Sequence, residues 1–334
     1  MPSVDVLLVS LGSTAGLRAA DDALADALRR AGATVALAPA SRPRELRTFM
    51  ATDLAWAHMA RRAAERGIAA HAPRVVVYST TTAAMFWPVP GAIRYDAPAA
   101  GNRPGRHGLW QRPLERRRLA EAPLLLPMTP GTLDETRGPH APSVVVPIPV
   151  TTDPALAGGA APLAVRDVDV LAYAADPEKK GLDRMLDAWR AARRGDEELL
   201  VAGLDPGHRA ALHEPGVRYL GQLGPQAYRA LLRRARVYLT APRREDYGIA
   251  QLEALADGAI LVTTPAPGPY AALPLARALD PRLVTEHLAD ALRAALDDPV
   301  PGYAARAAEL LAPFSPAAVD RTVRDDVLPR LLPG

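Results

Sequence analysis

The stretch Leu239–Pro265 constrains the fold most strongly, because it reads as strand, charged loop, helix and strand. The apolar run Val237–Thr240 ends before Pro242, and the helix that follows ends at Gly258, a typical C-cap glycine. Two strands joined by a helix in so short a stretch predict a parallel α/β sheet. Ligands of such sheets bind beyond the carboxyl ends of the strands, where the charged loop 243–246 is expected.

The helix of this stretch offers three kinds of contact to one ligand. The amides of Tyr247, Gly248 and Ile249 open the helix, where N–H groups have no intrahelical partner and suit an anion. Glu245 precedes these amides, and Glu253 lies about two turns into the helix at about 1.5 Å per residue. A nucleoside-diphosphate sugar presents sugar hydroxyls, a diphosphate and ribose hydroxyls in the same order. The alternative is an ordinary amphipathic helix with two incidental glutamates.

The same stretch resembles the motif of a known family. The large retaining "group 1" class of GT-B glycosyltransferases carries an E-x7-E pair preceding E-A-x-A-x-G. The matching residues are Glu245, Asp246, Tyr247, Gly248, Glu253, Ala254, Ala256 and Gly258. The resemblance implies an α/β fold with two Rossmann-like parallel-sheet domains facing a cleft, and a C-terminal helix that crosses back to the first domain. It also implies sugar transfer to an acceptor hydroxyl with retention, Glu245 binding the donor sugar and Glu253 the ribose.

Length and composition bound the alternatives. A chain of 334 residues predicts two domains of about 150 residues. We expect an acceptor-side domain at 1–152, a linker at 151–166, a nucleotide-sugar domain at 167–312 and a returning helix at 313–334. The absence of cysteine excludes disulfides and thiolate sites. The net charge of +3 is weak evidence for nucleic acid, so no such partner is expected. The chain lacks the pattern of a signal peptide or a membrane span, so we expect a cytoplasmic protein.

The first half opens as a βαβ unit. The run Val4–Val9 predicts a strand buried on both faces, and Gly12 and Gly16 follow it in a turn that lets the backbone approach a ligand. An ordinary strand-to-helix turn is the alternative. The G-x-G-x-x-G spacing is absent, so a nicotinamide cofactor is disfavoured. In the resembled family this loop faces the donor diphosphate. Further strands are expected at Arg74–Tyr78, Leu124–Met128 and Val144–Ile148, and a helix at Asp53–Arg66.

The segment Ile93–Arg118 combines glycines and prolines with a basic run that contains Trp110. Arginines with an interfacial Trp predict contact of Arg103–Arg118 with an anionic membrane at its inner face, or with a lipid-phosphate acceptor. A solvated face is the alternative. Asp96 falls where related transferases carry a His-Asp segment near the acceptor, although Tyr95 here replaces the histidine. The sequence leaves the acceptor open, and we expect it to be lipid-linked or a polysaccharide.

The second half contains the only lysines of the chain, Lys179 and Lys180. They follow the predicted strand Val168–Ala172, and a compact ammonium is a phosphate ligand that arginine does not replicate. The family carries K-G-x-D here, and its lysine, matching Lys180, binds the donor phosphate. Relatives also carry an arginine where this chain has Ala174. The candidates to replace its charge are Lys179, Arg243 and Arg18.

The remaining expectations concern the base, metal and competing functions. Leu223 follows a predicted strand end where the nucleotide base packs in the resembled family. The histidines have no metal-site spacing, so we expect no metal and no cofactor. The alternatives to a transferase are a GT-B-type nucleotide-sugar 2-epimerase and a catalytically silent nucleotide-sugar-binding protein, the latter motivated by Ala174.

Overall fold

The structure, a computed structural model, describes residues 3–43, 48–103, 105–153, 166–204 and 214–333. The chain divides into two compact units. Unit 1 contains Met1–Pro149 together with Pro316–Gly334, and unit 2 contains Val150–Ser315. The expected linker falls mostly on 154–165, outside the described residues.

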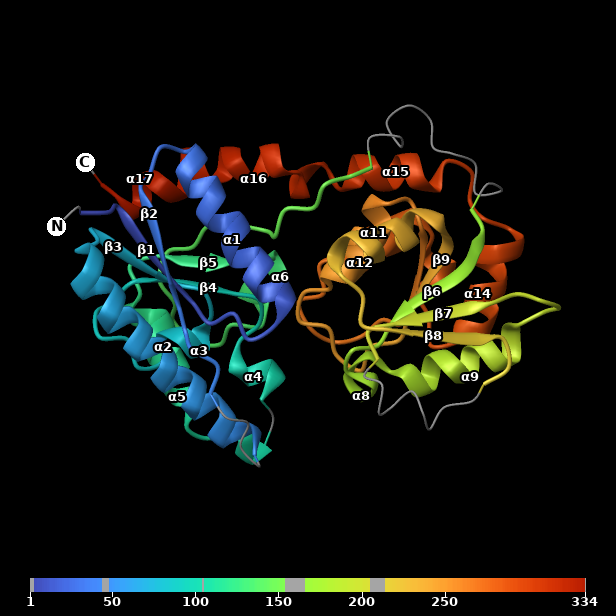
Figure 1. Cartoon of the computed structure of the whole chain (residues 1–334), viewed down its shortest axis with the longest axis horizontal. Coiled ribbons are helices and arrows are strands. Elements are labelled where there is room, and N and C mark those ends of the chain that lie inside the picture. Colours follow the sequence, from blue (N-terminus) through green and yellow to red (C-terminus); the bar gives the residue numbers. More distant parts are fainter. Residues whose placement is uncertain (1–2, 44–47, 104, 154–165, 205–213, 334) are drawn as a thin grey trace. The chain divides into compact units, whose positions relative to one another are not determined.

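Unit 1 is built on a parallel sheet with the strand order β2-β1-β3-β4-β5 (Figure 1). Its strands are β1 (Val6–Ser10), β2 (Val35–Pro39), β3 (Val75–Tyr78), β4 (Ala92–Tyr95) and β5 (Leu125–Pro127). Its helices before the unit boundary are α1 (Ala15–Arg30), α2 (Phe49–His71), α3 (Thr81–Ala84), α4 (Ala99–Asn102), η1 (Gly105–Gly108), α5 (Gln111–Glu121) and α6 (Pro130–Asp134). Crossover helices between parallel strands bury the sheet on both faces, which explains the uninterrupted apolar sequence of β1.

Alternate residues of β1 pack on opposite faces of this sheet. Leu7 and Val9 belong to a cluster with α2, whereas Val6 and Leu8 belong to a cluster with α1. All four side chains are fully buried. The period of two along the strand therefore sets which helix covers which face.

The segment after unit 2 completes the second of these clusters. It comprises α16 (Pro316–Thr322), a π-helical turn (Val323–Val327) and α17 (Leu328–Leu331), and it runs beside α1 (Figure 1). Its buried side chains recur every four residues: Val319, Val323, Val327 and Leu331. Arg30 on α1 binds Asp320 through two hydrogen bonds of 2.7 and 2.8 Å. The expected return of the C-terminal helix to the first domain is confirmed.

The strand expected at Val144–Ile148 is wrong. The amides of Val144 and Val146 donate to carbonyls of β5, but only an isolated bridge forms there, at Ser143. Pro147 and Pro149 have no N–H to continue the ladder, so the segment stays extended without becoming a strand.

Unit 2 repeats the architecture with the strand order β10-β9-β6-β7-β8, again all parallel. Its strands are β6 (Val168–Tyr173), β7 (Leu199–Ala202), β8 (Val217–Gly221), β9 (Ala235–Thr240) and β10 (Ile260–Thr263). Its α-helices are α8 (Pro177–Lys180), α9 (Leu182–Ala192), α11 (Pro225–Arg234), α12 (Ile249–Ala256), α13 (Ala272–Leu279), α14 (Leu288–Asp297) and α15 (Tyr303–Leu310). The expected class, two Rossmann-like parallel α/β sheets, is confirmed.

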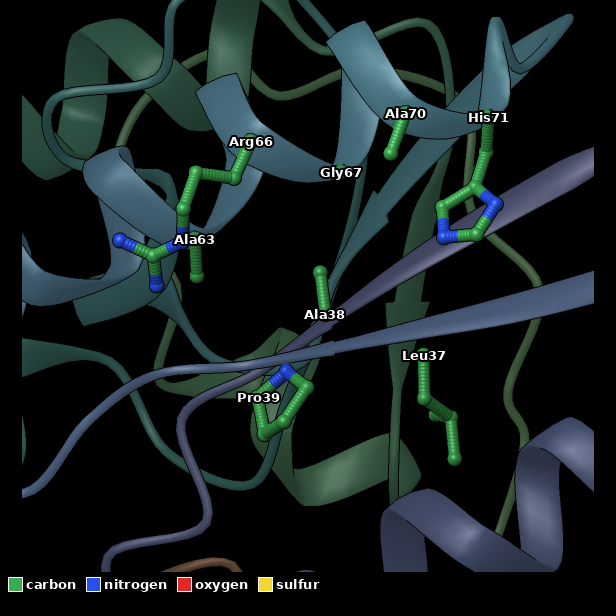
Figure 2. A pocket seen from close by; sticks show the side chains of 8 residues that line it. All are labelled: Leu37, Ala38, Pro39, Ala63, Arg66, Gly67, Ala70 and His71. Carbon is green, nitrogen blue, oxygen red and sulfur yellow. The ribbon is translucent and has the colours of Figure 1, made fainter. Parts of the chain in front are cut away.

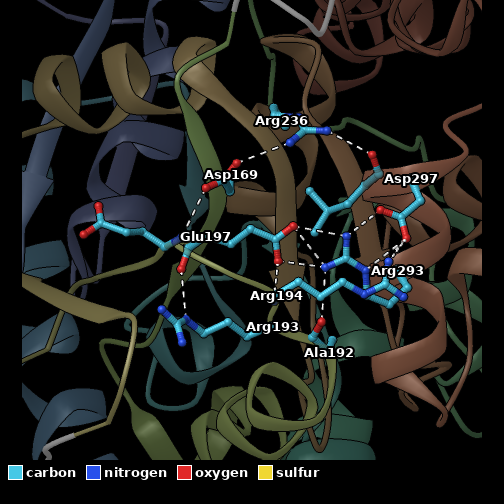
Figure 3. A network of polar contacts seen from close by, with 10 residues as sticks. Asp169, Ala192, Arg193, Arg194, Glu197, Arg236, Arg293 and Asp297 are labelled. Carbon is cyan, nitrogen blue, oxygen red and sulfur yellow. Dashed lines mark hydrogen bonds and ion pairs between the residues drawn. The ribbon is translucent and has the colours of Figure 1, made fainter.

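The arginine-rich surface of unit 2 is extensively paired with carboxylates (Figure 3). Arg293 on α14 binds Glu197 at 2.7 Å and also Asp297, and Arg236 on β9 binds Asp169 at 3.3 Å. These pairs neutralise guanidinium groups locally. Here the arginines therefore serve as structural partners rather than as one uncompensated positive surface.

Candidate active site

The candidate site of unit 2 begins where β6 ends. Asp176 caps α8 by accepting a hydrogen bond of 3.0 Å from the amide of Lys179. Gly181 then ends this short helix with φ +67°, and a Cβ there would lie 2.0 Å from the carbonyl oxygen of Ala241. Only glycine permits this backbone and this approach, which hold Lys179 and Lys180 against the end of β9.

Two lysine–carboxylate pairs join α8 to the loop after β9. The Nζ of Lys180 lies 2.7 Å from Oε2 of Glu245, and the Nζ of Lys179 lies 3.1 Å from Oδ2 of Asp246. The amide of Arg243 also donates to the carbonyl of Lys179 at 3.1 Å. Glu245 and Asp246 are buried, with exposed fractions of 4% and 8%.

Each carboxylate has a second partner. Gln251 on α12 donates from Nε2 to Oε2 of Glu245 at 3.0 Å, and Arg244 donates from Nε to Oδ1 of Asp246 at 2.8 Å. Burial alone would raise the pKa of Asp246, but the charges of Lys179 and Arg244 outweigh burial and lower that pKa. Asp246 is therefore held as a carboxylate.

Helix α12 opens beside these pairs. Gly248 precedes it with φ +88°, and a Cβ there would lie 2.9 Å from the ring of Tyr270. The carbonyl of Tyr247 accepts from the amide of Ala271 at 2.9 Å. The first turn of α12, which includes the amide of Ile249, thus begins next to Glu245 at the carboxyl end of β9.

Glu253, the second glutamate of the motif, lies in a different polar cluster. Its Oε1 is 3.9 Å from Nη1 of Arg229, which also forms a bidentate pair with the fully buried Asp257. Burial raises the pKa of Glu253, Arg229 opposes that shift, and Asp257 adds to it. The side chain keeps 27% of its surface exposed and can still meet a ligand.

Comparison with known proteins relates unit 2 to one family. Residues 168–298, which contain both glutamates and both lysines, match the family model "Glycosyl transferases group 1". This part of the chain is similar to the group 1 glycosyltransferases. No curated protein matches the chain.

Solved structures show that the chain has the GT-B fold. WaaG, a glycosyltransferase involved in lipopolysaccharide biosynthesis, is 16% identical with a TM-score of 0.65, covering 98% of this chain and 97% of WaaG. Anabaena Alr3699/HepE, solved with UDP and glucose, is 15% identical with a TM-score of 0.66, covering 96% and 98%. Sucrose-phosphate synthase of Thermosynechococcus elongatus is 16% identical with a TM-score of 0.70, covering 95% and 96%.

The other residues of the expected donor site lie outside the described side-chain contacts of the two lysine–carboxylate pairs. Gly12 follows β1 with φ +55°, and its carbonyl accepts from Arg18 at 2.7 Å, while Gly16 lies in the first turn of α1. Leu223 is half-buried in the loop between β8 and α11. Arg243 pairs at 2.6 Å with the exposed Asp183. None of these four expected donor residues makes a described polar side-chain contact with the lysine–carboxylate pairs.

Asp96 follows β4 and is half-buried. Its Oδ1 accepts from the amide of Ala97 at 2.9 Å, and its carbonyl accepts from Thr132 at 2.6 Å. Trp110 is half-buried and stacks on Phe86 with ring centroids 5.8 Å apart. Its neighbour Leu109 is 61% exposed.

Glu115 is a buried carboxyl that the sequence reading missed. Both of its oxygens accept from the amide of Ala99, at 2.8 and 3.0 Å, and its exposed fraction is 2%. Burial raises its pKa to about 7, against hydrogen bonds from Thr81 and Ala99. Gln111 and Leu119, four residues to either side, are also buried. The spacing of Gln111, Glu115 and Leu119 indicates one buried face of a helix. The many arginines in the same segment obscured this pattern.

An apolar hollow lies elsewhere in unit 1, between β2 and α2 (Figure 2). It holds about 310 Å³ and is lined by Leu37, Ala38, Pro39, Ala63, Arg66, Gly67, Ala70 and His71. It contains none of the expected site residues. Among the described residues, none of the helices is long and apolar enough to span a membrane, and no three His, Cys, Asp or Glu side chains gather as metal ligands.

Proposed function

We propose that this chain is a glycosyltransferase that moves a sugar from a nucleoside-diphosphate sugar to an acceptor hydroxyl, with retention and without a metal ion. The observation that supports it best is the 2.7 Å contact between Lys180 and the buried Glu245 at the start of α12. The contact brings together, in one unit, a cation for the diphosphate, a carboxylate for sugar hydroxyls and an anion-binding helix end.

The chemical roles follow from where charge develops. Cleavage of the bond to the sugar leaves negative charge on the departing nucleoside diphosphate. Lys180 and the amides of Tyr247–Ile249 stabilise that charge most strongly in the transition state, which lowers the barrier. An ammonium and helix amides can supply this stabilisation in place of a metal ion. Glu245 accepts hydrogen bonds from donor-sugar hydroxyls. Its two described contacts both use Oε2, so Oε1 is the atom available to the sugar.

Glu253 binds the ribose in this proposal. Its carboxylate accepts hydrogen bonds from the ribose hydroxyls, and Arg229 at 3.9 Å favours the ionised form that accepts them. Leu223 packs against the base, and the turn of Gly12 and Gly16 serves the diphosphate from unit 1. Lys179 and Arg243 add positive charge near the donor.

The acceptor is proposed to bind near Asp96 and to be lipid-linked or a polysaccharide. We also propose that Arg103–Arg118 contacts the inner face of an anionic membrane, which fits a cytoplasmic enzyme. Arg106, Arg116 and Arg117 are exposed, and Leu109 offers an apolar side chain beside them. Cosedimentation with phosphatidylglycerol vesicles, compared with phosphatidylcholine vesicles, tests this contact. Equal binding to both would contradict it.

Turnover of a donor panel tests the main proposal. The first donors are UDP-sugars, because the HepE structures contain UDP or UDP-glucose, followed by GDP-, ADP- and dTDP-sugars. Release of nucleoside diphosphate that depends on acceptor is expected, and retention is read from the anomeric coupling constant of the product. Interconversion of the donor would instead indicate a 2-epimerase. Donor binding without turnover would indicate a silent binding protein, for which the uncharged, fully buried Ala174 is the motivation.

A further inference from the structure

In each of the two lysine–carboxylate pairs, the carboxylate binds a lysine and one further donor. Glu245 is shared by Lys180 and Gln251, and Asp246 is shared by Lys179 and Arg244. A buried carboxylate that loses its only partner is strongly destabilising. Because each carboxylate here has a second donor, either lysine can turn away and leave its carboxylate hydrogen-bonded.

Exposure indicates which partner moves. Lys179 keeps 45% of its side chain exposed, whereas Arg244, the other partner of Asp246, keeps 20% and lies in the same loop two residues away. A long lysine side chain can redirect its ammonium at little cost, while the planar guanidinium is held against the carboxylate beside it. Lys179 is therefore the exchangeable partner of Asp246.

A backbone hydrogen bond holds α8 in place while the side chain of Lys179 moves. The amide of Arg243 donates to the carbonyl of Lys179 at 3.1 Å, so α8 stays next to the loop when the side chain swings. The adjacent ammonium of Lys180 makes the same kind of contact with Glu245. Consecutive lysines can thus leave adjacent carboxylates for adjacent phosphoryl groups.

We propose that Asp246 is a competing anion that holds Lys179 while the site is empty and yields it to the donor diphosphate. The inference rests on the proposed function and adds a specificity-determining residue to it. A diphosphate can engage both lysines and gains enough to replace the Lys179–Asp246 contact. A single phosphoryl group can bind at Lys180 alone and leave Lys179 with Asp246. Asp246 therefore weakens the binding of nucleoside diphosphates more than that of monophosphates.

The same contact explains how the chain supplies a second positive charge although Ala174 stands at the position of an arginine in the resembled family. Arg243 is already paired with Asp183 at 2.6 Å. Lys179 lies next to Lys180 and is tied to the same loop, so it supplies the second positive charge for the diphosphate. Asp246 keeps that charge neutralised until the ligand arrives.

Isothermal titration of the full-length protein with UDP and UMP, at low salt, tests the proposal. If UDP does not bind, the corresponding GDP, ADP or dTDP pair is used. In Asp246→Asn, Kd for the diphosphate is expected to fall about three- to fivefold, which is the typical value of a partly exposed ion pair. Kd for the monophosphate should fall less, so that the ratio of the monophosphate Kd to the diphosphate Kd rises. Asp187→Asn, on the exposed face of α9, is the matched control and should change neither value.

A double-mutant cycle tests whether the gain in diphosphate affinity in Asp246→Asn comes from the release of Lys179. Lys179→Met alone should raise Kd for the diphosphate several-fold, and in its background Asp246→Asn should bring no gain. An unchanged or higher diphosphate Kd in Asp246→Asn, or the same gain without Lys179, would overturn the inference while leaving the transferase proposal intact. Failure of the wild-type protein to bind any nucleoside diphosphate would instead overturn both. Asp246→Ser provides a second uncharged variant, and the Lys179→Met result stands by itself if neither Asp246 variant folds.

Discussion

Replacing Gly181 by alanine tests whether the lysines depend on the close approach of α8 to β9. The matched control is Gly195→Ala in the same unit, because Gly195 has φ +56°, close to the +67° of Gly181, but no atom within 4 Å of an added Cβ. A left-handed conformation costs a non-glycine residue about 1–2 kcal/mol, and the stiffer unfolded chain returns about 0.4–1 kcal/mol. Gly195→Ala should therefore lose only about 1 kcal/mol.

Gly181→Ala should lose more, because its Cβ would lie 2.0 Å from the carbonyl oxygen of Ala241. Real Cβ contacts stay beyond 3.0 Å, so α8 must move by at least 1.0 Å (3.0 minus 2.0). Such overpacking adds about 1–3 kcal/mol, giving a total of roughly 3 kcal/mol and a fall in Tm of roughly 6–12 °C for a unit of this size. The same shift would lengthen the 2.7 Å contact between Lys180 and Glu245 past hydrogen-bonding distance.

Thermal unfolding gives the Tm of both variants, and titration with the nucleoside diphosphate gives their Kd. We expect Gly181→Ala to show the larger fall in Tm and a weaker Kd, and Gly195→Ala to bind like the wild type. Equal Tm and equal Kd for the two variants would refute the reasoning that the carbonyl of Ala241 fixes the position of the lysines.

Three further predictions concern other parts of the chain. Lys180→Ala should lower kcat by about 100-fold, the effect typical of losing one charge-stabilising group, and Glu253→Ala should mainly weaken nucleotide affinity; unchanged kinetics in both would remove these site assignments. Glu115 ionises near 4.5 when unfolded but near 7 when folded, so the unfolded state alone releases its proton between these values and stability falls as pH rises. Between pH 5 and pH 8 the free energy of unfolding of the wild type, measured by denaturant titration, should fall by on the order of 3 kcal/mol more than that of Glu115→Gln, which cannot titrate. Parallel pH profiles of the two proteins would contradict this. Leu331→Ala should destabilise unit 1 by about 2–3 kcal/mol in denaturant titration, through the cavity that it leaves in the cluster shared with α1; a loss below about 0.5 kcal/mol would show that the tail contributes little.

The sequence predicted the framework because buried parallel strands have an unambiguous pattern. The apolar run of β1 and the strand–helix–strand of 239–265 lie where expected, and their carboxyl ends explain why Lys180 and Glu245 could be assigned to one region. The prediction of a strand at Val144–Ile148 failed, because apolar β-branched residues outweighed the missing amides of the prolines.

Pairing partners could not be predicted in the same way. Nothing in the order of residues shows that Asp246 would take Lys179 or that Arg229 would contact Glu253, since partners lie far apart along the chain. Glu115 was overlooked for a related reason. Its charge suggested a surface position, and only the helix packing around it makes it a buried acceptor for a backbone amide.

The return of the last segment to unit 1 has a consequence for biosynthesis. Residues 316–331 are translated only after the whole of unit 2, yet they supply Val319, Val323, Val327 and Leu331 to the core beside α1. During elongation the nascent first unit therefore exposes an uncovered apolar face while unit 2 emerges from the ribosome and folds as an insertion within it. Chaperone occupancy of the newly made chain should accordingly persist until residues 316–331 have left the ribosome and packed beside α1.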